Sequence, residues 1–159
     1  DSARFMMLSR SNEVELDFDF EKVTEKSKDN PVFYVQYAYA RINSIFRMLK
    51  FNLDKKIKLD KKEFSLNHHE IEILKKISEW PRCVEISSNK LEPHRISFYL
   101  YQLVTLFHVY WNLGKVNKEF RFVPENGNLN SSRLVLLQAL SIVIKNGMSI
   151  LGVSTPSSM

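Results

Sequence analysis

The sequence contains few of the residues that cross-link or interrupt a helical chain. Its single cysteine, Cys83, has no partner for an internal disulfide, which favours a reducing compartment. Only 4 glycines and 5 prolines occur among 159 residues, so long stretches carry no helix breaker. No stretch approaches the roughly 18 consecutive apolar residues of a membrane helix, and no secretory signal opens the chain. We therefore expect a helical protein that does not span a membrane.

Motifs for catalysis and for metal binding are also missing. The sequence has no glycine-rich phosphate loop, no dinucleotide-binding fingerprint and no Gly-x-Ser-x-Gly nucleophile turn. Its 4 histidines show no zinc-site spacing, and the adjacent His68 and His69 would point to different faces of a helix. Asp17 and Asp19 form a close carboxylate pair that is typical of a solvated loop. No residue is therefore predicted to be catalytic or to ligate a metal.

The charge balance is moderately basic. The formal net charge is +5 and the sequence pI is near 9.3, which permits an anionic partner without requiring one. Hydrophobic residues make up 44% and charged residues 26% of the chain, as in ordinary globular domains. The lysine-rich segment 55–62 lacks periodicity and is typical of a solvated connector.

Apolar periodicity and capping residues predict an all-α bundle of about five helices. Asn30-Pro31 is a strong start signal, and Asn67 followed by Glu70 resembles a capping box. Gly114 and Gly147 are expected to end the two longest later helices. The last helix is apolar nearly all round, which places it at the centre of the bundle. The expected helices span 31–50, 67–79, 82–88, 93–113 and 131–146, and the second should bury Ile71, Leu74 and Ile77.

A second stripe of side chains follows the first predicted helix, beside its apolar face. Tyr37, Arg41, Ser44 and Met48 recur at steps of four, three and four residues. Such a row suits an unstacked base, because the ring stacks, the guanidinium reaches phosphate and the thioether fills irregular space. The same stripe could instead pack against another helix, and spacing alone slightly favours packing.

The helix predicted over 93–113 ends in a cluster of rings. Four of the six residues from Phe107 to Asn112 carry rings, and they cannot all face the core. If Phe107 and Tyr110 are buried, His108 or Trp111 is left outside as a stacking platform. Trp111 could equally pack under the long loop that follows this helix.

Several segments, in order along the chain, resemble the carboxyl-terminal part of arginyl-tRNA synthetases, with their DALR-type anticodon-binding domain. Residues 29–41 (DNPVFYVQYAYAR) are similar to the entry into that domain, and residues 146–159 with the terminal methionine are similar to its end. Residues 3–10 and 16–19 look like family segments that follow the second ATP-binding signature. The sequence departs from the family at Tyr39, where histidine is common, and at Ser132, where alanine is usual.

The resemblance implies a fragment of a longer enzyme, and the chain accordingly begins with Asp1 in what looks like the end of a helix. Residues 1–30 would be a catalytic-domain remnant or connector, and residues 31–159 the anticodon-binding bundle. The full-length enzyme would attach arginine to its tRNA with ATP and Mg, whereas the fragment alone would be non-catalytic and take no cofactor. Its expected partner is the anticodon loop of arginine tRNA, and we expect a cytoplasmic monomer. The alternative is a helical protein–protein interaction module.

The resemblance also implies a binding site. In the family, aromatic residues on two helices approach the unstacked anticodon bases together with the terminal methionine. The residues carried over on that basis are Tyr37, Arg41, Tyr110 and Met159, and helix geometry adds Asn43 and Trp111. We expect these side chains to converge on one open, positively charged concavity.

Overall fold

The structure is a computed structural model that describes residues 1–11, 13, 25, 29–53, 55–59, 64–124, 127 and 129–159. These residues form helices and irregular segments without a strand, which confirms the all-α prediction. The carboxylate pair Asp17 and Asp19 lies outside the described residues. The helices are α1 (Ser2–Leu8), α3 (Pro31–Met48), α4 (His68–Ser78), α5 (Trp80–Lys90), α6 (His94–Val116), the short 3₁₀ helix η2 (Lys118–Phe120) and α7 (Ser131–Ile150).

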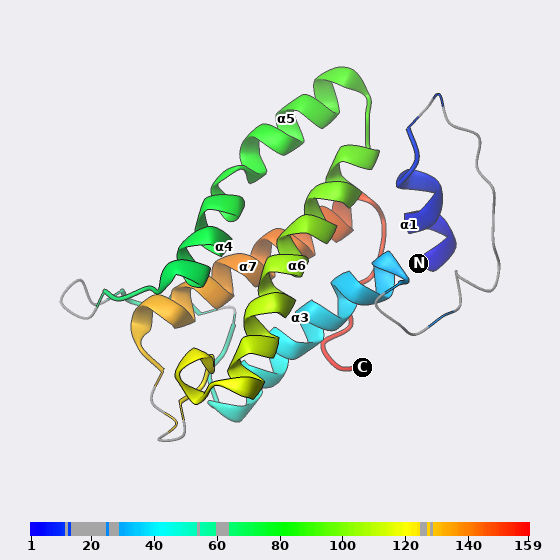
Figure 1. The fold of residues 1–159 in the computed structure, drawn as a ribbon. Helices are drawn as coiled ribbons and strands as arrows, with labels where there is room; N and C mark the ends of the chain where they lie inside the picture. The colour runs from blue at the N-terminus through cyan, green and yellow to red at the C-terminus, as the bar shows by residue number, and fades with distance from the viewer. Residues whose placement is uncertain are drawn as a thin grey trace.

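Helix α6 lies at the centre of the molecule. It contacts α1, α3, α4, α5, α7 and η2, whereas α7 packs against α3, α4 and α6 (Figure 1). The expectation that the last helix is the central one was therefore wrong. The reason is that α7 keeps an outer side in solvent, where Ile142 is 50% and Ile150 is 53% exposed.

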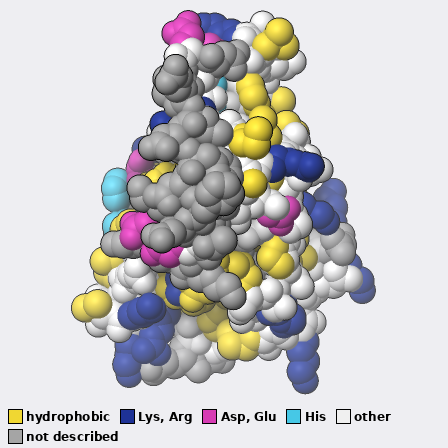
Figure 2. Space-filling view, turned by 90° about the vertical axis from the view of Figure 1, so that its right-hand side faces the viewer, with side chains coloured by type: hydrophobic (Ala, Val, Ile, Leu, Met, Phe, Trp, Pro, Cys, Tyr) yellow, Lys and Arg dark blue, Asp and Glu magenta, His cyan; other side chains and the backbone are white. Residues whose placement is uncertain are grey.

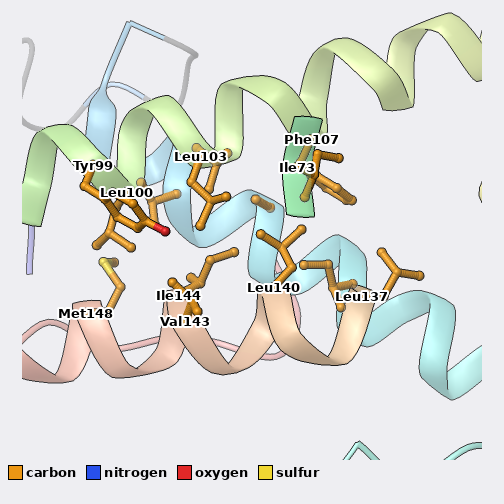
Figure 3. Close-up of a cluster of buried hydrophobic side chains, with 14 of the residues drawn as sticks. Ile73, Tyr99, Leu100, Leu103, Phe107, Leu137, Leu140, Val143, Ile144 and Met148 are labelled. Atoms are coloured by element: carbon orange, nitrogen blue, oxygen red, sulfur yellow. The ribbon is translucent and has the colours of Figure 1, made fainter. Parts of the chain in front are cut away.

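The core is formed where one stripe of α6 meets one stripe of α7. Figure 3 shows Leu100, Leu103 and Phe107 of α6 pointing toward apolar side chains of α7. These three residues are fully buried, as their helical spacing predicts. Their partners on α7 are Leu137, Leu140, Val143, Ile144 and Met148.

The start of α4 is fixed by the predicted capping box. The Asn67 side chain accepts a hydrogen bond from the Glu70 backbone at 3.0 Å, and the Glu70 carboxylate accepts one from the Asn67 backbone at 2.8 Å. Glu70 is fully buried, so the inner stripe of α4 continues through Ile73 to Ile77, which is partly buried against the core as predicted. Ile71 and Leu74 are consequently 39% and 41% exposed, which corrects the sequence-based expectation for these two residues.

Gly114 and Gly147 lie inside helices, contrary to the prediction that they end them. A Cβ on Gly114 would lie 3.0 Å from the Cα of Arg121, and one on Gly147 would lie 2.8 Å from the Cδ2 of Leu100. The two glycines therefore serve close packing, because a side chain would push the neighbouring segment away. The glycine that ends α7 is Gly152, which has φ +65° and closes a Schellman turn through the Val153 N–H bond to the Met148 carbonyl.

The two ends of the chain lie against the same bundle (Figure 1). Phe5 of α1 is 1% exposed within the core, and Arg4 donates to the Gly152 carbonyl at 2.6 Å. The tail that follows α7 runs beside α3, since Gln36 donates to the Ser154 carbonyl and Arg47 donates to the Ser157 carbonyl. Helix α1 thus packs on the bundle, while the predicted division of the chain at residue 30 stays a prediction.

Helix α7 has the length and apolar composition of a membrane-spanning helix, and among the described residues no other helix does. The expectation that no stretch meets this criterion was therefore wrong. In the structure 44% of that stretch is buried, and its inner side packs against α3, α4 and α6.

We expect Leu140→Ala to lower the free energy of unfolding by about 2–5 kcal/mol, because it opens a cavity between α6 and α7. The matched control is Ile142→Ala, two residues further on the same helix at 50% exposure, which should change stability by about 0.5 kcal/mol. Urea denaturation followed by circular dichroism measures both. Equal losses in the two variants would contradict the assignment of Leu140 to the core.

Candidate nucleic-acid interface

Three of the predicted site residues meet between α3 and α6. The guanidinium carbon of Arg41 lies 4.1 Å from the ring centroid of Tyr37 and 4.8 Å from that of Trp111. Arg41 also donates from Nη2 to the Tyr37 hydroxyl at 2.8 Å. Both rings are partly exposed, so the cluster reaches the surface. Cation–π contacts of this kind stabilise by about 0.5–2 kcal/mol and hold the three side chains in one arrangement.

A buried histidine, His108, contacts the cluster of Tyr37, Arg41 and Trp111 from the core side. His108 is 3% exposed, its Nε2 lies 3.1 Å from the Tyr34 carbonyl oxygen, and its Nδ1 lies 3.3 Å from Arg41 Nη1. A carbonyl oxygen only accepts hydrogen bonds, so Nε2 carries the proton and the Nδ1 lone pair accepts from Arg41. Burial lowers the pKa of His108 to about 4; the bond to Tyr34 opposes this shift and the Arg41 charge adds to it. The imidazole is therefore neutral at neutral pH.

A hollow of about 440 Å³ adjoins the cluster, between the carboxyl ends of α3 and α6 and the loop after η2. Its size falls in the range of small-ligand sites. Ser44, Met48, Trp111, Lys115 and Arg121 are among the residues that line it. The predicted stripe on α3 therefore has two environments: its first half packs against α6, and its second half, with Met48 61% exposed, opens to solvent. The interpretation as a packing surface therefore fits the first half of the stripe, and the interpretation as a binding surface fits the second half.

The two chain segments that border the hollow are rich in cations, and Lys115 and Arg121 line it. In the described segments 41–53 and 111–124, Glu119 is the sole carboxylate against the cations Arg41, Arg47, Lys50, Lys115, Lys118 and Arg121. Figure 2 faces the side of the molecule on which α1 lies in Figure 1, and it shows Lys and Arg side chains at several places on that side as well. No carboxylate of the described residues forms an ion pair with Arg41. This end of the bundle is therefore suited to an anionic ligand.

Tyr110 does not belong to this surface. Its side chain is fully buried, and its hydroxyl donates to Glu70 at 3.0 Å and accepts from Asn67 at 2.7 Å. The Glu70 carboxylate is paired in turn with Arg133, whose Nε lies 2.5 Å away. Burial raises the pKa of Tyr110 to about 12. The expectation that Tyr110 approaches an unstacked base is therefore corrected: its ring belongs to the polar network that anchors α4 on α6 and α7.

Asn43 and Met159 do not take part in the cluster of Tyr37, Arg41 and Trp111. The Asn43 amide donates to the Tyr39 carbonyl at 2.9 Å, so the side chain is bound to its own helix. Met159 is 54% exposed and follows Ser157, whose carbonyl accepts from Arg47. The tail thus ends near the carboxyl end of α3, and the six predicted residues do not form one concavity.

Sequence reasoning missed the roles of His108 and Arg121. The prediction left His108 or Trp111 outside the core, and the structure buries the histidine while it leaves Trp111 partly exposed. Trp111 also packs against Phe122 at 6.1 Å between ring centroids, as the alternative of packing under the loop anticipates. Arg121 stands between Phe120 and Phe122, an alternation that points the arginine away from the two rings and could have signalled its position.

Groups of three or more residues that could hold a metal ion are not found in the described part of the chain. Cys83 is partly buried, and burial raises the pKa of its thiol. Neither observation indicates a metal site or a reactive thiol in the described part of the chain.

The chain is similar to known proteins along its whole length. The family model for the DALR anticodon binding domain matches residues 35–159. The chain is 54% identical over 159 residues to an arginine–tRNA ligase from Pelagibacter ubique (strain HTCC1062), and 47% identical over 166 residues to one from Rhizobium meliloti (strain 1021). Both matches cover 100% of this chain and 28% of the relative. The chain therefore spans about 28% of the length of these curated relatives.

Solved structures share the fold. A Campylobacter jejuni protein assigned as an arginyl-tRNA synthetase superimposes with a TM-score of 0.83 at 26% identity, over 99% of this chain and 33% of its own. The Thermus thermophilus arginyl-tRNA synthetase superimposes with a TM-score of 0.79 at 23% identity, over 99% of this chain and 26% of its own. The second likeness, at its lower identity, concerns the fold alone.

The lowered pKa of His108 predicts acid-sensitive folding. Between pH 6.5 and about 4 the unfolded chain binds a proton at this residue that the folded chain does not, so stability falls as the pH falls. Lowering the pH from 7 to 5 should lower the free energy of unfolding by roughly 2 kcal/mol through this group. Urea denaturation at both pH values measures the loss, and His108→Gln should show a smaller one. An equal loss in the variant would assign the pH dependence to other groups.

Proposed function

This chain belongs to the family of DALR anticodon binding domains, and on that premise we propose that it binds the anticodon arm of a tRNA through the end of the bundle where α3 and α6 terminate. The observation that carries the proposal is the stacked cluster of Tyr37, Arg41 and Trp111 at the edge of a cationic hollow. Rings from two helices and a guanidinium between them are a common means of holding single-stranded nucleotides.

The chemistry of the surface divides between its two parts. The partly exposed rings of Tyr37 and Trp111 offer π-faces and edges to unstacked bases, and such stacking contributes about 1–3 kcal/mol per base. Arg41, Lys115 and the other cations at this end neutralise backbone phosphates. Met48, at the open side of the hollow, supplies an adaptable apolar contact.

We further infer that the chain serves as the tRNA-binding part of an ATP-dependent arginine–tRNA ligase. The support is the name of the relatives to which it is similar along its whole length. The attachment of arginine, with ATP and Mg, would then use residues outside this chain. The cytoplasmic location and the monomeric state stay predictions. The alternative of a protein–protein interaction module has no specific observation in its favour.

Replacing either exposed ring should weaken RNA binding. We expect Tyr37→Ala and Trp111→Ala each to raise the Kd for arginine tRNA by about 5- to 100-fold, because each removes one stacking surface. Phe98→Ala is the matched control, since this ring lies on α6 at 56% exposure but at the opposite end of the helix. Fluorescence anisotropy with labelled tRNA at fixed salt measures all three. Unchanged affinity in Tyr37→Ala and Trp111→Ala would show that the rings are structural.

The salt dependence of binding should identify the cations that contact phosphates. Lys115→Gln should reduce the slope of log K against log salt by about 0.7, the value for one single-strand phosphate contact. Lys90→Gln, at the exposed end of α5, removes the same charge away from the hollow and should leave the slope unchanged. Titrations at several salt concentrations measure both slopes. Equal changes in the two variants would mean that net charge alone drives binding.

A further inference from the structure

The Arg41 guanidinium is held on several sides before any ligand binds. The Cζ atom of Arg41 lies 4.1 Å from the ring centroid of Tyr37 and 4.8 Å from that of Trp111. The Tyr37 hydroxyl also accepts a hydrogen bond from Arg41 Nη2 at 2.8 Å. His108 contributes the contact from the core side, with Nδ1 at 3.3 Å from Nη1. An arginine on a flexible side chain is thereby reduced to one orientation.

From this geometry we infer that His108 is a positioning residue for RNA binding, which fixes the Arg41 guanidinium so that its remaining N–H groups meet a backbone phosphate. The inference rests on the proposed function of the α3 and α6 surface. The guanidinium has five N–H groups, and the contacts to Tyr37 and His108 engage one on each terminal nitrogen. The rest stay available along the edge of the planar group, where arginine binds phosphate in a bidentate manner.

The inference requires an acceptor at the Nδ1 position of residue 108. A histidine provides it because the Tyr34 carbonyl takes the proton on Nε2 and so leaves the Nδ1 lone pair facing α3. A protonated imidazole would lose this acceptor and repel the guanidinium. Burial at 3% exposure keeps the ring neutral, and Nδ1 lies 3.3 Å from Arg41 Nη1.

A purely structural role for His108 makes a different prediction. The ring packs against Tyr34 at 4.2 Å and Phe107 at 5.5 Å between ring centroids, so it also fills space between α3 and α6. If His108 only fills space, a replacement should change RNA affinity only as far as it destabilises the fold. The effect should then not depend on which of the two ring nitrogens the new side chain imitates.

Two isosteric substitutions separate the roles of the nitrogens. In His108→Asn the Oδ1 atom lies as many bonds from Cα as Nδ1 did, so an acceptor for Arg41 is kept. In His108→Gln the Nε2 atom replaces the imidazole Nε2, so the donor to Tyr34 is kept and the atom at the Nδ1 position is lost. We expect His108→Gln to raise the Kd for an RNA hairpin with the arginine tRNA anticodon arm by about three- to tenfold, and His108→Asn by less than about twofold.

The Arg41→Ala background tests whether His108 acts through Arg41. Without the guanidinium, His108→Gln should cause no further loss of RNA affinity, as expected for two residues of one unit. A loss of the same size in both backgrounds, or equal losses in the asparagine and glutamine variants, would overturn the inference and assign His108 to packing alone. All variants are compared at temperatures at which circular dichroism shows them folded.

A measurement without RNA separates this inference from the proposed function. Rotation about the Cζ–Nε bond of Arg41, followed by nitrogen-15 NMR, should be slow in the wild type and in His108→Asn and faster in His108→Gln. Equal rotation rates would overturn the positioning role even if the chain binds tRNA. Slow rotation together with no binding of the RNA hairpin would leave the guanidinium fixed but refute the proposed function, and with it the phosphate contact.

Discussion

Helix α6 buries a broad side of its surface against its neighbours, and the position of that side controls the rest of the structure. Leu100, Leu103, Phe107 and Tyr110 lie on the buried side and are all fully enclosed. With about 3.6 residues per turn, Trp111 lies four residues after Phe107 and eleven after Leu100, so it shares their side of α6. Trp111 is nevertheless partly exposed, because it lines the hollow at the carboxyl end of α6, and there its ring contacts Arg41.

The same packing explains why the site combines rigidity with access. Its first half is held by a buried neutral histidine and by ring contacts between α3 and α6. Its second half opens because Gly114 allows the loop at Arg121 to lie directly against α6, which leaves the end of α3 uncovered. A binding surface that is already held in one arrangement loses little conformational entropy when a ligand binds to it.

The buried polar network at the start of α4 has a different task. Asn67, Tyr110 and Glu70 are hydrogen-bonded to one another, and Arg133 forms an ion pair with Glu70, so removing either charge would leave the other buried without its partner. The network ties the capping box of α4 to α6 and α7, so the polar groups specify how these helices meet. Tyr110, which the sequence suggested as a ligand-binding residue, therefore has a structural role in this network.

The sequence by itself determined the helices, since the capping box at Asn67, the start at Pro31 and the stripe on α6 depend on local spacing. It also placed Tyr37 and Arg41 one turn apart on the same face of α3, where the two side chains are in contact. Only the tertiary structure decided which apolar residues of α4 are exposed, that Tyr110 is sealed, and that Gly114 and Gly147 permit close packing and do not end helices. These outcomes depend on which helix lies opposite, and periodicity within one helix carries no information about its neighbour.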